Sequence, residues 1–160
     1  MILFLEPHFE AKPWAGEKLN KIYDCPEGVG EAWIVSGYNK KSSIIKNGRF
    51  KGESLRHVWT RHPELFNGIK DKEFPLLIKI IDAKEDLSVQ VHPNDSYALE
   101  KHNSLGKFEC WYFLNQNDAK TCVAGVKAIT QSDLKQSIES NYILDRLIER
   151  NVNNGDLVVI

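Results

Sequence analysis

Cysteine is scarce in this sequence, and long apolar runs are missing. The 160 residues contain three cysteines, Cys25, Cys110 and Cys122, with no Cys-x-x-Cys pair. This odd number and wide spacing argue against a disulfide framework and a thiolate zinc cluster, so we expect buried thiols that act as small apolar groups. The first apolar run ends before Glu6 and Pro7, far short of a signal peptide or membrane span, which predicts a cytoplasmic protein.

An excess of charge of one sign is also missing. The formal net charge is −1, which gives no electrostatic reason to expect nucleic acid or an anionic membrane as a partner. The composition, with 42% hydrophobic and 27% charged residues, is that of a soluble globular protein. A chain of this length fits one compact domain, and we expect a single domain over residues 1–160.

Short apolar or alternating runs bounded by turn residues predict seven strands. They cover residues 31–36, 42–48, 74–83, 87–93, 109–115, 120–126 and 155–160. Helical patterns lie between them, at residues 53–66 and 96–102, after Thr130, and at residues 143–150. Many strands with few helices favour a mainly β sandwich or barrel with several short helices over a parallel α/β sheet.

The sequence stops directly after its last predicted strand begins. The turn cluster of residues 153–156 is followed by only four apolar residues. This pattern has two interpretations, a fold that is incomplete at the C-terminus or a terminal strand docked in a sheet.

The stretch "LSVQVHP" (87–93) alternates like a strand, yet one of its faces is polar. Successive side chains of a strand point to opposite faces, so Ser88, Gln90 and His92 share one side. The other side is apolar and is enough to attach the strand to a core, so the polar side faces solvent or a polar cavity. The side chains of the stretch "GKFECWY" also alternate between two sides, with Lys107 and Glu109 on one of them.

Three of these side chains are potential metal ligands. If both strands contribute to one barrel, Gln90, His92 and Glu109 converge inside it. An imidazole nitrogen, a carboxylate and an amide oxygen suit zinc or another first-row divalent ion. A surface strand edged with polar groups gives the same pattern, so the residues alone leave both interpretations open.

Lys79 lies inside the apolar run "LLIKII", where a charge is costly unless it reaches water or a partner. It either extends to solvent from an edge strand or lines the same cavity and offers positive charge to an anionic ligand. His8, beside Pro7, has no chemical context in the pattern. The histidines of the helical stretches are expected at the surface, namely His57, His62 and His102.

The longest informative segment is "FPLLIKIIDAKEDLSVQVHPND" followed by "GKFECWY". It resembles the core signature of the type I mannose-6-phosphate isomerases, the metal-dependent phosphomannose isomerases of the cupin superfamily. The blocks "KPWAGEKL", "GEAWIVS", "GESL" and "LFNG" resemble the other blocks of this family in the same order. The resemblance covers nearly the whole chain and implies a cupin-like jelly roll.

The resemblance implies a role for seven residues. They are the zinc ligands Gln90, His92 and Glu109, the catalytic residue Lys107, and the substrate-binding residues Trp14, Lys79 and Ser88. In the complete enzyme, one divalent ion would occupy each site.

The resemblance also implies an activity. Members of the family are aldose–ketose isomerases of carbohydrate metabolism that interconvert mannose 6-phosphate and fructose 6-phosphate. In the family, a segment like "GDLVVI" precedes a fourth histidine ligand and an arginine, which this sequence does not reach. We therefore expect a cupin-type isomerase domain truncated before the last metal ligand, which alone binds zinc weakly and turns over poorly. An unfinished barrel edge further predicts a homodimer.

Two other functions fit the pattern. A non-catalytic sugar-phosphate-binding or regulatory cupin that ends naturally at Ile160 would keep the same residues. An iron cupin oxygenase fits less well, because such sites usually present two histidines and one carboxylate.

Overall fold

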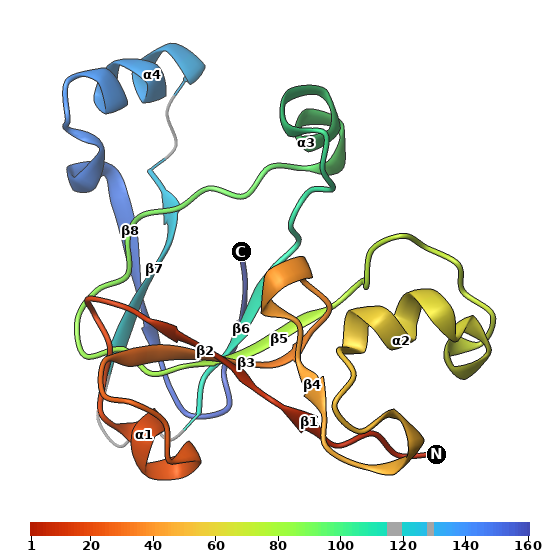
Figure 1. The fold of residues 1–160 in the computed structure, drawn as a ribbon. Coiled ribbons are helices and arrows are strands. Elements are labelled where there is room, and N and C mark those ends of the chain that lie inside the picture. The colour runs from red at the N-terminus through yellow and green to blue at the C-terminus, as the bar shows by residue number, and fades with distance from the viewer. Residues whose placement is uncertain (115–119, 128–129) are drawn as a thin grey trace. The chain divides into compact units, whose positions relative to one another are not determined.

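The chain divides into two units, Met1–Val89 and Gln90–Ile160, in a computed structural model. The structure describes residues 1–114, 120–127 and 130–160. Figure 1 shows the strands and helices of each unit along the chain. The expectation of a single domain over residues 1–160 stays a prediction.

A three-stranded antiparallel sheet organises the first unit. Its order is β2 (His8–Ala11), β3 (Val29–Ser36) and β5 (Leu77–Ile81). The β-branched and aromatic residues of β3 and β5 favour the extended backbone, because these side chains pack well on a pleated surface. A smaller antiparallel pair joins β1 (Leu5–Glu6) to β4 (Ile44–Ile45).

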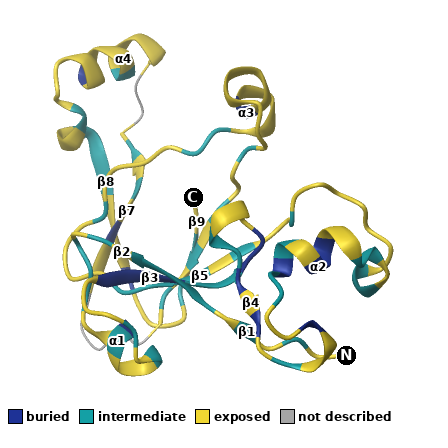
Figure 2. Cartoon of the chain, in the orientation of Figure 1, coloured by how far each residue is buried: buried dark blue, intermediate teal, exposed yellow. Residues whose placement is uncertain are grey.

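The two faces of the three-stranded sheet differ. On one face, Phe9, Ala32 and Ile80 lie opposite one another across the three strands. This face packs against helix α1 (Lys18–Tyr23), whose Leu19 is fully buried. Figure 2 shows that β3 is buried over much of its length. The apolar face therefore holds the core, and the opposite face of the sheet carries the charged side chains.

Helix α2 (Leu55–Arg61) builds a second core in the first unit. The Ser54 hydroxyl accepts a hydrogen bond from the backbone N–H of His57 and so caps the start of the helix. Val58 packs against Ile45 and Phe50. Three short 3₁₀ helices complete this unit, namely η1 (Asn39–Lys41), η2 (Gly48–Phe50) and η3 (Pro63–Phe66).

Two antiparallel strand pairs form the sheets of the second unit. Strand β6 (Cys110–Tyr112) pairs with β9 (Leu157–Val159), and β7 (Lys120–Val126) pairs with β8 (Leu147–Val152). Each pair joins segments that are far apart in the sequence, so these contacts are long-range rather than local hairpins.

Side-chain caps fix the start of both helices in the second unit. Helix α3 (Asp95–His102) follows Asn94, whose side chain accepts a hydrogen bond from the Tyr97 N–H. Helix α4 (Gln131–Glu139) begins with a capping box in which Thr130 and Asp133 bond to each other's backbone. The 3₁₀ helix η4 (Ile143–Arg146) follows.

The predicted mainly β class with several short helices is confirmed. Strands occur within the predicted segments 31–36, 74–83, 109–115, 120–126 and 155–160, and helices within 53–66 and 96–102 and after Thr130. The segment 42–48 forms only the two-residue strand β4.

Two local predictions are wrong. The segment 87–93 is not a strand, and no strand of the described residues pairs with it, so Val91 is 91% exposed rather than attached to a core. The segment 143–150 is not one helix, because Leu147–Val152 pairs with β7 and leaves only η4 helical. In this second case, strand pairing overrides a helical spacing of apolar residues.

The three cysteines lie in different environments. Cys122 is buried, and burial raises the pKa of its thiol, while Cys25 packs against the core beside Leu19. Cys110 is exposed on β6, so the prediction of a buried thiol is wrong there. Among the described residues, no helix has the length and apolar character needed to cross a membrane.

The fully buried Leu19 gives a direct test of the first core. Replacing Leu19 by Ala should lower the free energy of unfolding by about 3 kcal/mol, because the lost methyl groups leave a cavity between α1 and the sheet. The matched control is Ile22→Ala on the same helix, where the side chain is 65% exposed and the change should be within about 0.5 kcal/mol. Equal losses in urea unfolding would contradict this assignment of the core.

Candidate metal and sugar-phosphate site

The carboxylate of Glu109 is the centre of a polar cluster in the second unit. Its Oε2 atom lies 2.7 Å from the Lys107 ammonium and 3.1 Å from Nε2 of His92. Its Oε1 atom accepts a hydrogen bond of 2.6 Å from the indole N–H of Trp111. The Glu109 side chain is only 13% exposed. Three of the seven residues predicted for the site, His92, Lys107 and Glu109, are therefore brought together.

A close backbone approach brings the two segments of this cluster together. The Lys107 N–H donates to the carbonyl of Pro93, and the Gly106 N–H donates to the carboxylate of Asp95. A Cβ atom at Gly106 would lie 2.6 Å from the backbone of residues 93–95, so only glycine fits there. The Gly-Lys pair and the His-Pro-Asn-Asp segment thus position His92 beside Glu109.

The environment of Glu109 keeps its carboxylate charged. Burial raises the pKa of the carboxyl, but hydrogen bonds from Lys107 and Trp111 and the nearby positive charges outweigh it. The pKa of Glu109 therefore lies below its ordinary value. An ionised carboxylate is the form that a metal ion requires.

His92 and Glu109 fit a divalent metal as two of its ligands. Two donors on one tetrahedral zinc lie roughly 3.3 Å apart, given zinc–ligand bonds of about 2.0–2.1 Å. The observed 3.1 Å between His92 Nε2 and Glu109 Oε2 is close to this separation. The Trp111 hydrogen bond orients the carboxylate, as outer partners of metal ligands commonly do.

The third predicted ligand, Gln90, comes two residues before His92 on the same irregular segment and is exposed. Among the described residues, no three His, Cys, Asp or Glu side chains come together to hold a metal. His92 and Glu109 are thus two predicted ligands whose donor atoms lie close enough to share a metal. The role of the Gln90 amide stays a prediction.

The other predicted residues belong to the first unit. Lys79 lies on β5, an edge strand of the three-stranded sheet, and its ammonium is 3.1 Å from Oε1 of Glu31. Lys79 thus lies on an edge strand and has a carboxylate partner, while its place in a common cavity with the proposed metal ligands stays a prediction. Trp14 is half-buried in the turn before α1, and Ser88 is exposed after β5.

Glu31 resembles Glu109 in its surroundings. The indole N–H of Trp33, two residues further along β3, donates to Oε2 of Glu31 over 2.9 Å. Burial raises the pKa of Glu31, but the Trp33 hydrogen bond and the charges of Lys79 and Lys12 outweigh it, so the pKa is lowered. The Glu31 side chain is 7% exposed and ionised at neutral pH.

The sequence analysis missed His8, Glu10, Glu31 and Trp33. His8 Nε2 lies 2.6 Å from Oε1 of Glu10, so His8 does have a chemical context. The signal was present, because residues 8, 10 and 12 alternate with apolar residues, as do 31 and 33. Sorting alternate residues onto the two sides of a strand, as was done for "LSVQVHP", would have found this charged face.

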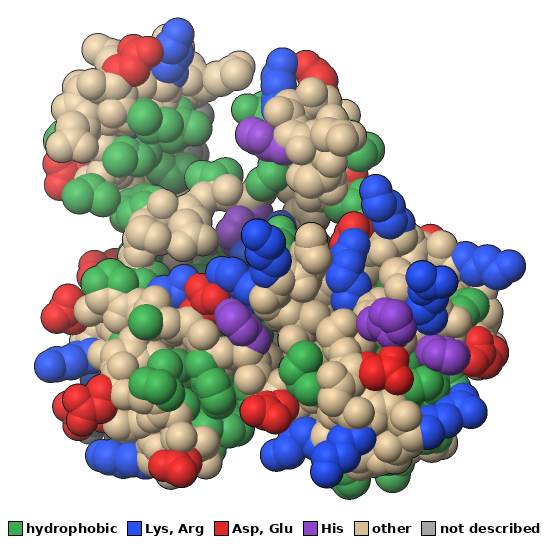
Figure 3. All heavy atoms as spheres, viewed as in Figure 1, with side chains coloured by type: hydrophobic (Ala, Val, Ile, Leu, Met, Phe, Trp, Pro, Cys, Tyr) green, Lys and Arg blue, Asp and Glu red, His purple; other side chains and the backbone are tan. Residues whose placement is uncertain are grey.

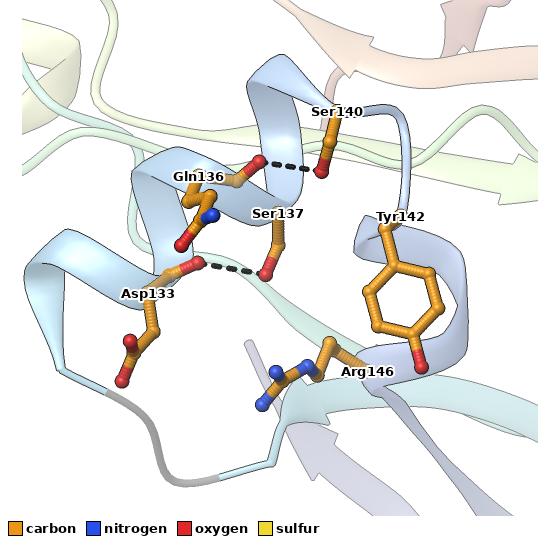
Figure 4. A pocket seen from close by; sticks show the side chains of 6 residues that line it. All are labelled: Asp133, Gln136, Ser137, Ser140, Tyr142 and Arg146. Atoms are coloured by element: carbon orange, nitrogen blue, oxygen red, sulfur yellow. Dashed lines mark hydrogen bonds between the residues drawn. The ribbon is translucent and has the colours of Figure 1, made fainter.

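A separate polar hollow lies beside α4 in the second unit. Figure 4 shows the side chains that line it, namely Asp133, Gln136, Ser137, Ser140, Tyr142 and Arg146. The Ser137 and Ser140 hydroxyls donate to backbone carbonyls of the helix, at Asp133 and Gln136. None of the predicted site residues lines this hollow.

Known proteins are similar to this chain in fold and in sequence. The crystal structure of mannose 6-phosphate isomerase from Bacillus subtilis matches 99% of this chain and 52% of that chain, with a TM-score of 0.91 and 36% identity. The mannose-6-phosphate isomerase of Streptococcus mutans is 39% identical over 161 residues, and ManA of Bacillus subtilis is 39% identical over 163 residues. The chain spans about half the length of these relatives, 51% of each.

The structural similarity defines the class of protein. The chain has a cupin-like, mainly β fold that it shares with a sugar-phosphate isomerase. The catalytic-domain model of the type I phosphomannose isomerases matches residues 3–140. The chain therefore belongs to the type I phosphomannose isomerase family, which is a family of metal-dependent enzymes.

The lowered pKa of Glu31 predicts a pH-dependent contribution to stability. The folded-state pKa lies below the ordinary value of 4.5, so the stabilisation is complete above that value and is lost as pH falls through the folded-state pKa. At pH 7, Glu31→Gln should lower the free energy of unfolding by about 1–3 kcal/mol, because two ammonium groups lose their carboxylate.

Urea unfolding between pH 7 and pH 3 measures this effect. The difference between the unchanged chain and Glu31→Gln should shrink as the solution is acidified. The control Glu27→Gln removes an exposed carboxylate and should change the free energy of unfolding by less than about 0.5 kcal/mol throughout. A Glu31→Gln difference that stays constant with pH would contradict the assignment.

Proposed function

We propose that this chain is the N-terminal part of a metal-dependent isomerase that interconverts mannose 6-phosphate and fructose 6-phosphate. The observation that carries the proposal is the meeting of His92, Lys107 and Glu109 in a chain of the type I phosphomannose isomerase family. The Glu109 carboxylate lies within 3.1 Å of both the His92 imidazole and the Lys107 ammonium, so the cluster offers both metal ligands and a proton-transfer group.

The residues fit the chemistry of aldose–ketose isomerisation. The reaction moves a proton between C1 and C2 of the sugar through an enediol-like intermediate, in which negative charge develops on an oxygen. Lys107 is the proposed catalytic residue, because its side chain is 44% exposed and its ammonium can reach a ligand while it contacts Glu109. It would stabilise the developing charge or transfer the proton.

Zinc is the metal that we propose, held by Gln90, His92 and Glu109. Nitrogen and oxygen ligands without thiolate suit this ion. When bound, the ion would polarise the sugar oxygens as a Lewis acid. The residues of the chain then have the remaining tasks of fixing the ligand geometry and binding the sugar phosphate.

Trp14, Lys79 and Ser88 are proposed to bind the substrate. Lys79 supplies positive charge for a phosphate group, the Trp14 ring an apolar surface for a sugar, and the Ser88 hydroxyl a hydrogen-bonding group. We also propose a cytoplasmic location and no nucleic-acid or membrane partner. The formal net charge of −1 supports the absence of a nucleic-acid partner, and Figure 3 shows both acidic and basic side chains on the visible face.

A coupled assay of mannose 6-phosphate isomerisation tests the function. The complete protein that contains this chain should convert mannose 6-phosphate to fructose 6-phosphate, and Glu109→Gln should reduce kcat at least about 100-fold because a ligand and the partner of Lys107 are lost. Binding of the sugar phosphate without turnover would instead favour the non-catalytic cupin. Oxygen consumption would favour the oxygenase.

Zinc titration into the purified chain tests the metal ligands. His92→Ala should weaken zinc binding at least about tenfold, because the imidazole beside Glu109 is removed. The matched control is His102→Ala at the end of α3 in the same unit, which should leave the affinity unchanged. Equal affinities for the unchanged chain and His92→Ala would contradict the proposed ligand set.

A homodimer is the proposed assembly of the chain. On one face of the β6–β9 pair, Tyr112 lies opposite Leu157 and Cys110 lies opposite Val159, and all four are exposed. An uncovered apolar strand pair favours association with a second copy.

Light scattering measures this association. Leu157→Lys should shift the chain towards the monomer, because a charge would be buried in the contact. The control Leu144→Lys changes a leucine of η4 with nearly equal exposure, 61% against 62%, and should leave the dimer intact. A strict monomer at high concentration would contradict the proposal.

A further inference from the structure

Two glutamates lie directly opposite each other on the charged face of the first unit. Glu10 on β2 pairs in register with Glu31 on β3, and the next row on the same face is His8, Trp33 and Lys79. Like charges directly opposite on neighbouring strands are destabilising. Such a pair persists when cations lie between the carboxylates or beside them.

Three lysines supply those cations. Lys12 lies 3.7 Å from Oε2 of Glu31 and 4.0 Å from Oε2 of Glu10. The Lys79 ammonium donates to Oε1 of Glu31 over 3.1 Å, and the Lys41 ammonium lies 2.8 Å from Oε1 of Glu10. Three positive charges and two negative charges leave an excess of one positive charge on this face.

Of the three lysines, Lys12 is the one whose ammonium lies farthest from the carboxylates it pairs with. Its two nearest carboxylate oxygens, at 3.7 and 4.0 Å, are beyond hydrogen-bond distance, so within the described part of the chain its ammonium forms ion pairs but no hydrogen bond. An ammonium has three N–H donors, and the Lys12 side chain is 29% exposed. Lys12 can therefore donate to an anionic ligand.

The stem of Lys12 is fixed in place beside a predicted substrate-binding residue. A Cβ atom at Gly30 would lie 2.7 Å from the Trp14 ring and 2.9 Å from Cβ of Lys12. The ring and the lysine stem therefore both pack on the bare backbone of Gly30. Glu31, the next residue, then holds the ammonium end of the same side chain.

We propose that Glu31 is a positioning residue that holds the Lys12 and Lys79 ammonium groups where both bind the phosphate group of the sugar-phosphate substrate. This inference rests on the proposed function and adds Lys12 and Glu31 to its site. The ligand is a phosphate monoester dianion, which takes hydrogen bonds from several ammonium groups at once. Glu31 is 7% exposed and receives the Trp33 N–H, so it is rigid enough to fix both lysines.

A purely structural role for Glu31 makes a different prediction. If Glu31 only neutralises the lysines, Glu31→Gln raises the positive charge of this face and tightens phosphate binding. If Glu31 positions the lysines, Glu31→Gln weakens phosphate binding although the charge has become more favourable. The direction of the change distinguishes the two roles.

Titration calorimetry with inorganic phosphate measures whether each substitution weakens or tightens phosphate binding. Lys12→Met should weaken phosphate binding about tenfold, the loss expected for one charge-assisted hydrogen bond. Glu31→Gln should weaken it about fivefold, and Lys12→Arg should restore most of the affinity. The control Lys46→Met removes an exposed lysine of the same unit and should have no effect. Circular dichroism at the temperature of the titration confirms that each variant is folded.

Kinetics of the complete enzyme separate this inference from the proposed function. Lys12→Met and Glu31→Gln should raise KM for mannose 6-phosphate with little change in kcat. Unchanged or tighter phosphate binding in both variants would overturn the inference even if the enzyme isomerises its substrate. Phosphate binding that depends on Lys12 and Glu31, in a protein without isomerase activity, would keep the inference as an anion site and overturn the proposed function.

Discussion

A largely buried carboxylate held by an indole and an ammonium is the interaction on which both charged regions depend. In the first unit, Glu31 receives the N–H of Trp33 and the ammonium of Lys79. In the second unit, Glu109 receives the N–H of Trp111 and contacts the ammonium of Lys107. In each case the tryptophan comes two residues after the glutamate, so both side chains lie on one side of an extended backbone. The charge is thereby kept ionised and oriented at low exposure, which an isolated carboxylate could not achieve.

The arrangement divides the chemical tasks between the units. The second unit brings an imidazole, a carboxylate and a lysine together, and the proposed metal would bind to the first two. The first unit presents ammonium groups that suit a phosphate, on the face of the sheet opposite the core around Leu19. Under the proposed function the two kinds of group have different tasks, because a metal polarises sugar oxygens and ammonium groups neutralise a phosphate dianion.

Short apolar runs predicted β3 and β5, and the family resemblance placed His92 and Glu109 in one site. Alternation failed at residues 87–93, where the described residues offer no strand to pair with. The helical spacing of apolar residues failed at residues 147–150, where pairing with β7 decided the conformation. The strand that pairs with a segment can lie far from it in the sequence, so a local pattern does not identify it. The contacts of Glu31 with Lys12 and Lys79 depend on strand register in the same way.

The central claim is that a metal ion binds through His92 and Glu109 rather than through the exposed thiol of the neighbouring Cys110. X-ray absorption spectroscopy of the zinc-loaded protein tests it most directly. The account predicts only nitrogen and oxygen ligands at about 2.0–2.1 Å, with the outer-shell scattering of an imidazole. A sulfur ligand at about 2.3 Å, or a zinc spectrum without imidazole scattering, would contradict it.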